Sequence, residues 1–162
     1  MDKQEAVRLV EDYGDMVLRL ALAKTDNRHD AEDVTQEVFL RLLRKGPEKF
    51  DSDDHARHWL LRVTLQCSND LFRARNRRRE LPLETAETVS APAADETGDT
   101  LTAVLKLPEN LRVTVHLYYY ESLSIAQTAK VLGKSEGAVK ARLSRARNKL
   151  RELLTEGDEE FV

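Results

Sequence analysis

The chain has 162 residues, of which 41% are hydrophobic and 34% charged, with a formal net charge of -3. This composition suffices for one folded domain or two small ones, and no run approaches the roughly 20 apolar residues of a membrane span. The N-terminus lacks the basic-then-apolar order of a signal peptide, and a single cysteine, Cys67, excludes an internal disulfide framework. We therefore expect a cytoplasmic protein.

Three helices are predicted in the N-terminal half, at residues 3–24, 30–44 and 54–75, because apolar side chains recur there at helical spacing. Four more are predicted in the C-terminal half, at residues 101–105, 110–119, 124–132 and 135–154. Residues 113–119 are β-prone in composition but lie between helical signals. No segments read as paired strands, so we predict an all-α fold.

The helix at residues 30–44 carries acids in its first turn and bases toward its end, which suits the helix dipole. Its apolar side chains cover more than one stripe. Val34, Val38 and Leu42 form one row, and Phe39, Leu40 and Leu43 extend the apolar surface around the helix. The second row either packs in the core or docks on a partner.

The helix at residues 54–75 has an apolar face and a polar one. The side chains predicted to point inward are Ala56, Leu60, Val63, Cys67 and Leu71. Those predicted to lie partly outward are Arg57, His58, Arg62, Gln66 and Asn69, with Trp59 near the edge. A cluster of arginines follows at Arg73, Arg75, Arg77, Arg78 and Arg79. Tryptophan is common in cores, yet tryptophan with arginine also offers the base stacking and phosphate contact of single-strand binding.

Residues 80–99 separate the two halves. They contain six acids, no base, two prolines and one glycine, with little apolar periodicity. This composition predicts a flexible acidic linker between two small helical domains. A second acidic run, at residues 155–162, predicts a tail.

Residues 124–154 read as a helix-turn-helix in which Gly133 supplies the left-handed turn and Ser135 caps the second helix. An apolar stripe in the second helix consists of Val139, Leu143, Ala146, Leu150 and Leu153. The opposite face is narrow and small, with Arg145 to one side and Lys140, Arg142, Arg147 and Lys149 on the flanks. A solvated surface would also carry cations, but from Lys130 to Arg151 only Glu136 opposes eight bases. We predict a helix that enters the major groove of DNA.

In this order, the segments DAEDVTQEVFLRLLRK, HARHWLLRVTLQCSNDLFRARNRRR and LPENLRVTVHLYYYESLSIAQTAKVLGKSEGAVKARLSRARNKL resemble sigma-70 family factors of the extracytoplasmic-function branch. The resemblance spans nearly the whole chain. It implies sigma region 2 at residues 1–79, the linker at 80–99, region 4 at 100–154 and the acidic tail at 155–162. The implied function is that of a bacterial transcription initiation factor, which is not an enzyme and uses no metal or other cofactor.

The resemblance also implies a role for individual residues. Core RNA polymerase would be contacted through its β′ clamp helices by Asp33, Gln36, Glu37, Phe39, Leu40 and Arg41. The minus-10 element would be recognised and melted by Arg57, His58, Trp59, Arg62, Asn69, Arg73, Arg77 and Arg78. The minus-35 element would be read as duplex by Ser135, Gly137, Lys140, Ala141, Arg142, Ser144, Arg145 and Lys149. Region 4 would also touch the β flap, and Ala141 stands where the family often has Ser.

Control by a separate anti-sigma factor is expected, because the sequence contains no appended sensor. The alternative function is that of a helix-turn-helix regulator that binds duplex operators without polymerase and uses its N-terminal half for dimerisation. An enzyme is not predicted, because the sequence has no phosphate-binding glycine loop. His55 and His58 also lack the two further ligands of a structural zinc site.

Overall fold

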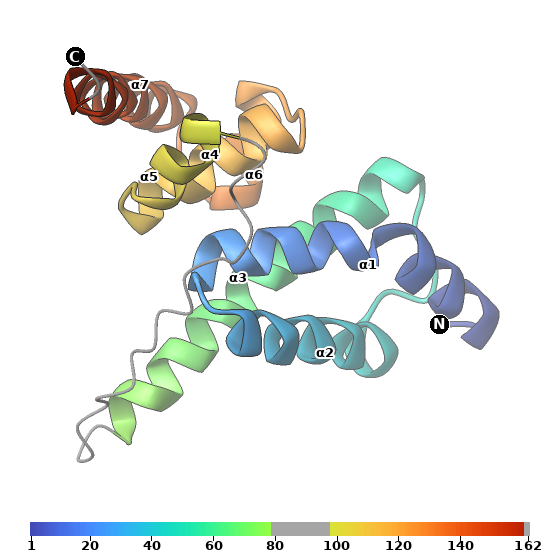
Figure 1. The fold of residues 1–162 in the computed structure, drawn as a ribbon. Coiled ribbons are helices and arrows are strands. Elements are labelled where there is room, and N and C mark those ends of the chain that lie inside the picture. The colour runs from blue at the N-terminus through green and yellow to red at the C-terminus, as the bar shows by residue number, and fades with distance from the viewer. Residues whose placement is uncertain (79–97, 161–162) are drawn as a thin grey trace. The chain divides into compact units, whose positions relative to one another are not determined.

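The computed structural model describes residues 1–78 and 98–160, which belong to two compact units at residues 1–90 and 91–162 (Figure 1). We call these the N-terminal and C-terminal units. Every regular element in the described residues is a helix, which confirms the all-α prediction. Residues 79–97, including most of the predicted linker, lie outside the described residues. No helix in the described residues is long and apolar enough to cross a membrane.

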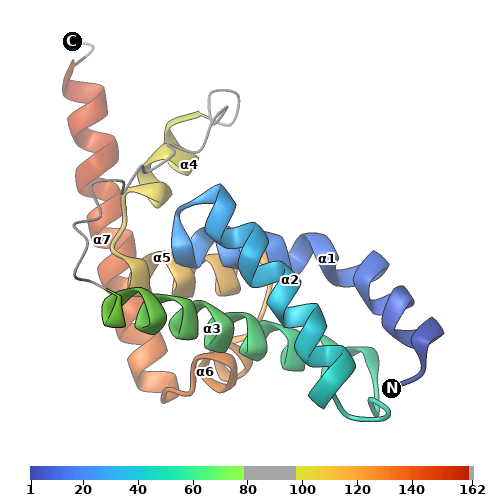
Figure 2. The same cartoon turned by 90° about the horizontal axis from the view of Figure 1, so that it is seen from below.

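The N-terminal unit consists of α1 (Lys3–Thr25), α2 (Arg28–Lys45) and α3 (Asp53–Arg77), each of which packs against the other two (Figure 2). The largest fully buried side chains between them include Leu9, Leu20, Leu42, Leu60 and Leu61. Each helix starts at a residue whose side chain accepts a hydrogen bond from the first turn, namely Asp2, Asn27 and Ser52. These caps explain why the helix starts could be predicted to within two residues.

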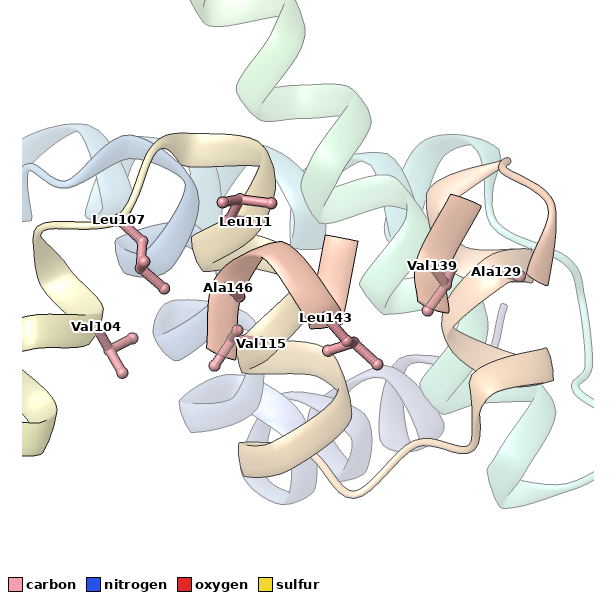
Figure 3. Close-up of a cluster of buried hydrophobic side chains, with 8 residues drawn as sticks. All are labelled: Val104, Leu107, Leu111, Val115, Ala129, Val139, Leu143 and Ala146. Atoms are coloured by element: carbon pink, nitrogen blue, oxygen red, sulfur yellow. The ribbon is translucent and has the colours of Figure 1, made fainter. Parts of the chain in front are cut away.

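The C-terminal unit consists of α4 (Gly98–Leu105), α5 (Glu109–Val115), the π-helical segment η2 (His116–Tyr120), α6 (Ile125–Leu132) and α7 (Glu136–Glu160). Its buried core comprises Val104, Leu107, Leu111, Val115, Ala129, Val139, Leu143 and Ala146 (Figure 3). This core is assembled from all four α-helices and the α4–α5 connection. The inward stripe predicted for α7 is confirmed for Val139, Leu143 and Ala146, whereas Leu150 packs against the core only partly buried and Leu153 is half-buried outside it.

Three boundaries in this unit differ from prediction. Helix α4 begins at Gly98, so the last two residues assigned to the linker are helical. Helix α7 continues to Glu160 through the predicted acidic tail, because no proline ends it and one glycine is tolerated within a long helix. The single helix predicted at residues 110–119 widens into η2, where the backbone N–H of Glu121 donates to the carbonyl of His116.

The helix-turn-helix geometry follows from three local features. Ser124 and Gln127 form a capping box at the start of α6. Gly133 ends α6 with a φ of 66°, where an added Cβ would meet nothing within 4 Å, so its backbone conformation is what requires glycine. Ser135 Oγ accepts from the backbone N–H of Ala138 at 3.1 Å and starts α7. These contacts confirm the predicted turn.

Candidate nucleic-acid interface

Helix α7 buries one side and exposes a basic one. Val139 and Ala146 are completely buried, which turns the opposite side of the helix outward. The predicted minus-35 residues on the exposed side are Ser135, Gly137, Lys140, Ala141, Ser144, Arg145 and Lys149, whereas Arg142 is half-buried. At about 100° per residue, Arg145 and Lys149 lie on one flank and Lys140 on the other. The small centre at Ala141 lets the helix approach a groove with cations on both sides.

Arg147, which was predicted to lie on a flank of α7, has a neighbour that the sequence did not predict, Tyr119. Arg147 Nη1 donates to the Tyr119 hydroxyl at 3.2 Å. Tyr119 belongs to η2, and both residues are exposed. The run of three tyrosines at residues 118–120 was the available signal, but periodicity alone gives no account of a π-helical turn.

Helix α3 presents most of the predicted minus-10 residues on one side. Arg62, Asn69, Arg73 and Arg77 are exposed and lie within about 80° of one another around the helix axis. Arg78 follows at the helix end and is also exposed. These residues form a polar face to which the adjoining Gln66 also belongs. We call it the α3 face.

Arg57 does not belong to the α3 face. It lies about 140° around the helix from Arg62 and is half-buried. Tyr13 of α1 donates its hydroxyl hydrogen bond to the carbonyl of Asp53 at 3.4 Å. Burial is the main cause of the raised Tyr13 pKa, which the charge of Arg57 opposes only weakly. The resemblance grouped Arg57 with Arg62, but the two side chains lie on different sides of α3.

A groove of about 350 Å³ lies between the C-terminal part of α2 and the first half of α3. Its lining residues are Glu37, Arg41, Arg44, Lys45, Trp59, Val63 and Gln66. Trp59 is half-buried and its ring contacts Phe50, with centroids 5.9 Å apart. His58 is also half-buried. An indole wall beside several cations suits an unstacked base and the phosphates that flank it.

The outer side of α2 carries apolar residues that the core does not use. Leu40 is 41% and Leu43 is 55% exposed, whereas the row containing Val34 and Val38 is buried. The predicted polymerase contacts Asp33 and Gln36 are exposed on the same side, and Glu37 and Phe39 are half-buried. Of the two interpretations of the second apolar row, this geometry favours docking on a partner. Leu43 was not among the predicted contact residues.

Arg41 faces α3 rather than the outer side of α2. Its Nη2 lies 2.7 Å from Asp70 Oδ2 and its Nε lies 3.3 Å from Glu37 Oε1. The Asp70 hydrogen bond is the main cause of a raised Arg41 pKa. The resemblance placed Arg41 among the docking residues, and that assignment stays a prediction. The structure adds an ion pair between Arg41 of α2 and Asp70 of α3.

The arginine cluster after α3 also divides into two groups. Arg75 forms a bidentate ion pair with Asp30 of α2, with Nη1 and Oδ2 2.7 Å apart. Arg73, Arg77 and Arg78 are exposed. Asp30 was predicted only as an acid of the first helical turn, but it is buried and paired. One member of the cluster therefore stabilises the fold, and the exposed ones can meet phosphate.

Cys67 is buried in the core of the N-terminal unit, as predicted. Burial raises the pKa of its thiol from 9.0 to about 11. Within residues 1–78 and 98–160, no group of three His, Cys, Asp or Glu side chains is placed to hold a metal ion.

Comparisons with known proteins match both units. Residues 9–78 match the family described as "Sigma-70 region 2", and residues 98–150 match "Sigma-70, region 4". The chain is 33% identical to the ECF RNA polymerase sigma factor SigE of Mycolicibacterium smegmatis, over 94% of this chain and 62% of that protein. It is 34% identical to the ECF RNA polymerase sigma factor SigM of Mycobacterium tuberculosis, over 84% of this chain and 70% of that one.

A solved structure gives the same fold. CnrH, determined in complex with the cytosolic domain of CnrY, is 29% identical and superposes with a TM-score of 0.67. The match covers 96% of this chain and 90% of CnrH. The chain thus spans almost the whole of CnrH, but less than two thirds of the length of SigE.

Proposed function

Because this chain belongs to the extracytoplasmic-function branch of the sigma-70 family, we propose that it is a bacterial transcription initiation factor that directs core RNA polymerase to specific promoters. We assign region 2 to residues 1–79 and region 4 to residues 100–154, joined by residues 80–99. The acidic residues 155–162 follow region 4, and those up to Glu160 extend α7. The observation that carries the proposal is the exposed basic side of α7 opposite the buried Val139, Leu143 and Ala146.

The minus-35 element is read as duplex by α7 under this proposal. Its small centre enters the major groove, where Arg145 reaches a guanine edge and Lys140 and Lys149 meet the two phosphate walls. Ala141 offers no hydroxyl, so only the methyl group of the Ala141 side chain can contact the base opposite it. Arg142 is half-buried and has less reach than Arg145.

The minus-10 element is held in melted form by the N-terminal unit. Unstacking a base costs a few kcal/mol, and stacking on an aromatic side chain returns about 1–3 kcal/mol. The groove beside Trp59 supplies the aromatic ring on which the base stacks. Arg62 and Arg73 of the α3 face contact the phosphates of the DNA backbone. Opening of the duplex then needs binding energy but no nucleotide hydrolysis, so the protein works without enzyme activity of its own.

Core polymerase docks on the outer side of α2, where Leu40 and Leu43 are exposed among polar side chains. The β′ clamp helices are the proposed partner there, and region 4 reaches the β flap. Docking fixes the distance between the two DNA-binding units. Two modest DNA contacts then act together through a raised effective concentration, which makes promoter spacing part of specificity.

An anti-sigma factor is the proposed regulator. The CnrH structure was determined with the cytosolic domain of CnrY, and this chain shares its fold. A protein that covers the outer side of α2 would compete with polymerase for Leu40 and Leu43. We place the complex in the cytoplasm, where core polymerase acts.

The test is run-off transcription with purified core polymerase on a promoter library, with and without this protein. Start sites that appear only when the protein is added support the proposal and reveal both promoter elements. Arg145→Ala should weaken promoter use by about 1–3 kcal/mol and relax specificity at one minus-35 base. A uniform loss across sequences would make Arg145 a phosphate contact.

A paired variant tests the docking surface. Leu40→Ser with Leu43→Ser should lower affinity for core polymerase while helix content stays unchanged, because both side chains are exposed in the isolated protein. The matched control is Val7→Ser with Val10→Ser, which changes two exposed valines of α1.

If no new start sites appear in the run-off experiment and the protein alone binds duplex operators, the helix-turn-helix regulator becomes the better account.

A further inference from the structure

The π-helical segment η2 holds an exposed tyrosine beside α7. Regular α-helical hydrogen bonding gives way here to the Glu121-to-His116 bond, and Ser122 follows with a φ of 59°. π-helical turns are rare and occur often at functional sites. Tyr119 is 51% and Tyr120 is 49% exposed, so two neighbouring aromatic rings lie partly in solvent. Because both rings are exposed, packing in the core of the C-terminal unit does not account for them.

The turn is held from two sides. His116 Nε2 lies 2.8 Å from Glu121 Oε2, and both side chains are nearly buried. Tyr118 packs against the hydrophobic core and meets the Tyr119 ring edge to face, with centroids 4.9 Å apart. The ring of Tyr119 is therefore positioned before any ligand arrives, which lowers the entropy cost of using it.

Tyr119 meets a cation of α7. Its hydroxyl accepts a hydrogen bond from Arg147 Nη1 at 3.2 Å. Among the side chains that the structure describes, at residues 1–78 and 102–155, no acidic one forms an ion pair with Arg147. Arg147 lies on the same flank of α7 as Lys140, two helical turns or about 10 Å further along the axis. That flank is the one proposed to meet a phosphate wall.

We infer that Tyr119 and Arg147 together bind one backbone phosphate beside the minus-35 element, an inference that rests on the proposed function of α7. Arginine has five N–H donors, so one can hold the tyrosine while others face the anion. The tyrosine oxygen accepts from Arg147, and its own O–H proton remains to donate to the same phosphate. Two elements thus supply donors to one anion, with Tyr119 also positioning Arg147.

The probe is the promoter duplex recovered by run-off mapping, prepared as a series in which one phosphate at a time is replaced by a neutral methylphosphonate. Binding of the complete holoenzyme is measured for the wild type, Tyr119→Phe and Arg147→Ala. Arg147→Ala should bind the unmodified duplex about tenfold more weakly and Tyr119→Phe about threefold more weakly. One methylphosphonate should weaken the wild type by a similar factor yet have little further effect on Arg147→Ala.

Tyr120→Phe is the matched control, because Tyr120 is equally exposed but stacks on His116. It should bind like the wild type. If Tyr119→Phe and Arg147→Ala also bind like the wild type while Arg145→Ala is impaired, the inferred phosphate contact is wrong and the proposed function stands. If Arg145→Ala is unimpaired as well, the reading of DNA by α7 itself fails. A loss that shows no coupling to any single phosphate but lowers affinity for core polymerase would make the pair a protein contact, and so overturn the inference.

Discussion

Arg75 of α3 and Asp30 of α2 form a bidentate ion pair that joins the end of one helix to the start of another across 45 residues of sequence. Only 4% of the Asp30 side chain is exposed, compared with 41% of the Arg75 side chain. The hydrogen bonds to Asp30 are the main cause of a raised Arg75 pKa. The pair ties the C-terminal part of α3 to the first turn of α2, and it takes Arg75 out of the set of arginines that can bind DNA.

Arg75→Ala should lower the free energy of unfolding of the N-terminal unit by about 2 kcal/mol, because it leaves a buried carboxylate without its partner. Urea denaturation followed by Trp59 fluorescence measures this, since Trp59 is the chain's one tryptophan. Arg77→Ala is the control and should change stability by less than about 0.5 kcal/mol. Adding Asp30→Asn to Arg75→Ala should recover part of the loss. Equal midpoints for the two arginine variants would show that the ion pair contributes nothing.

Exchanging the charges of Arg41 and Asp70 distinguishes an effect on stability from an effect on binding to core polymerase. Because Arg41 is tied to Asp70, Arg41→Asp alone should reduce stability and Asp70→Arg should do the same. The double exchange should restore part of both losses, which we expect to be about 1 kcal/mol each for a partly exposed pair. Recovery is incomplete because Glu37 and Arg73 then lie beside like charges. Core-polymerase affinity should recover along with stability. Restored stability without restored affinity would instead identify Arg41 as a direct polymerase contact.

Arg77→Ala combined with Arg78→Ala should flatten the salt dependence of promoter binding. Each lost phosphate contact changes the slope of log K against log salt by about 0.7–0.9, so the pair should change it by about 1.5. Holoenzyme binding at several KCl concentrations gives the slope. Stability should not change, because both side chains are exposed. An unchanged slope would confine these arginines to a structural role.

Cys67 should be nearly unreactive in the folded protein. Burial disfavours the thiolate and raises the pKa to about 11 from 9.0, so its ionised fraction at pH 8 is about a hundredfold smaller than in an exposed cysteine. Alkylation by iodoacetamide, followed by mass spectrometry, should be slow in buffer and rapid in urea. Rapid labelling of the native protein would mean that α3 opens on the time scale of the reaction.

The sequence by itself determined where the helices lie and which sides they bury. Asp2, Asn27, Ser52 and Ser124 can each cap a helix with their own side chain, so those starts depend on local chemistry. The stripe headed by Val139 repeats at helical spacing, so its burial also follows from the sequence. The order of these segments was enough for the resemblance that the family comparisons confirm.

Only the tertiary structure decided which charges pair with one another and which remain exposed. Arg41 meets Asp70 across 29 residues and Arg75 meets Asp30 across 45, and both contacts depend on how α2 and α3 pack. The Tyr119–Arg147 contact needs the π-helical turn as well as the packing of α7. Helical periodicity places a side chain on one face of its own helix, but it contains no information about which residue of another helix lies opposite. Which residues of two helices lie opposite each other is set by the way the helices pack around the core.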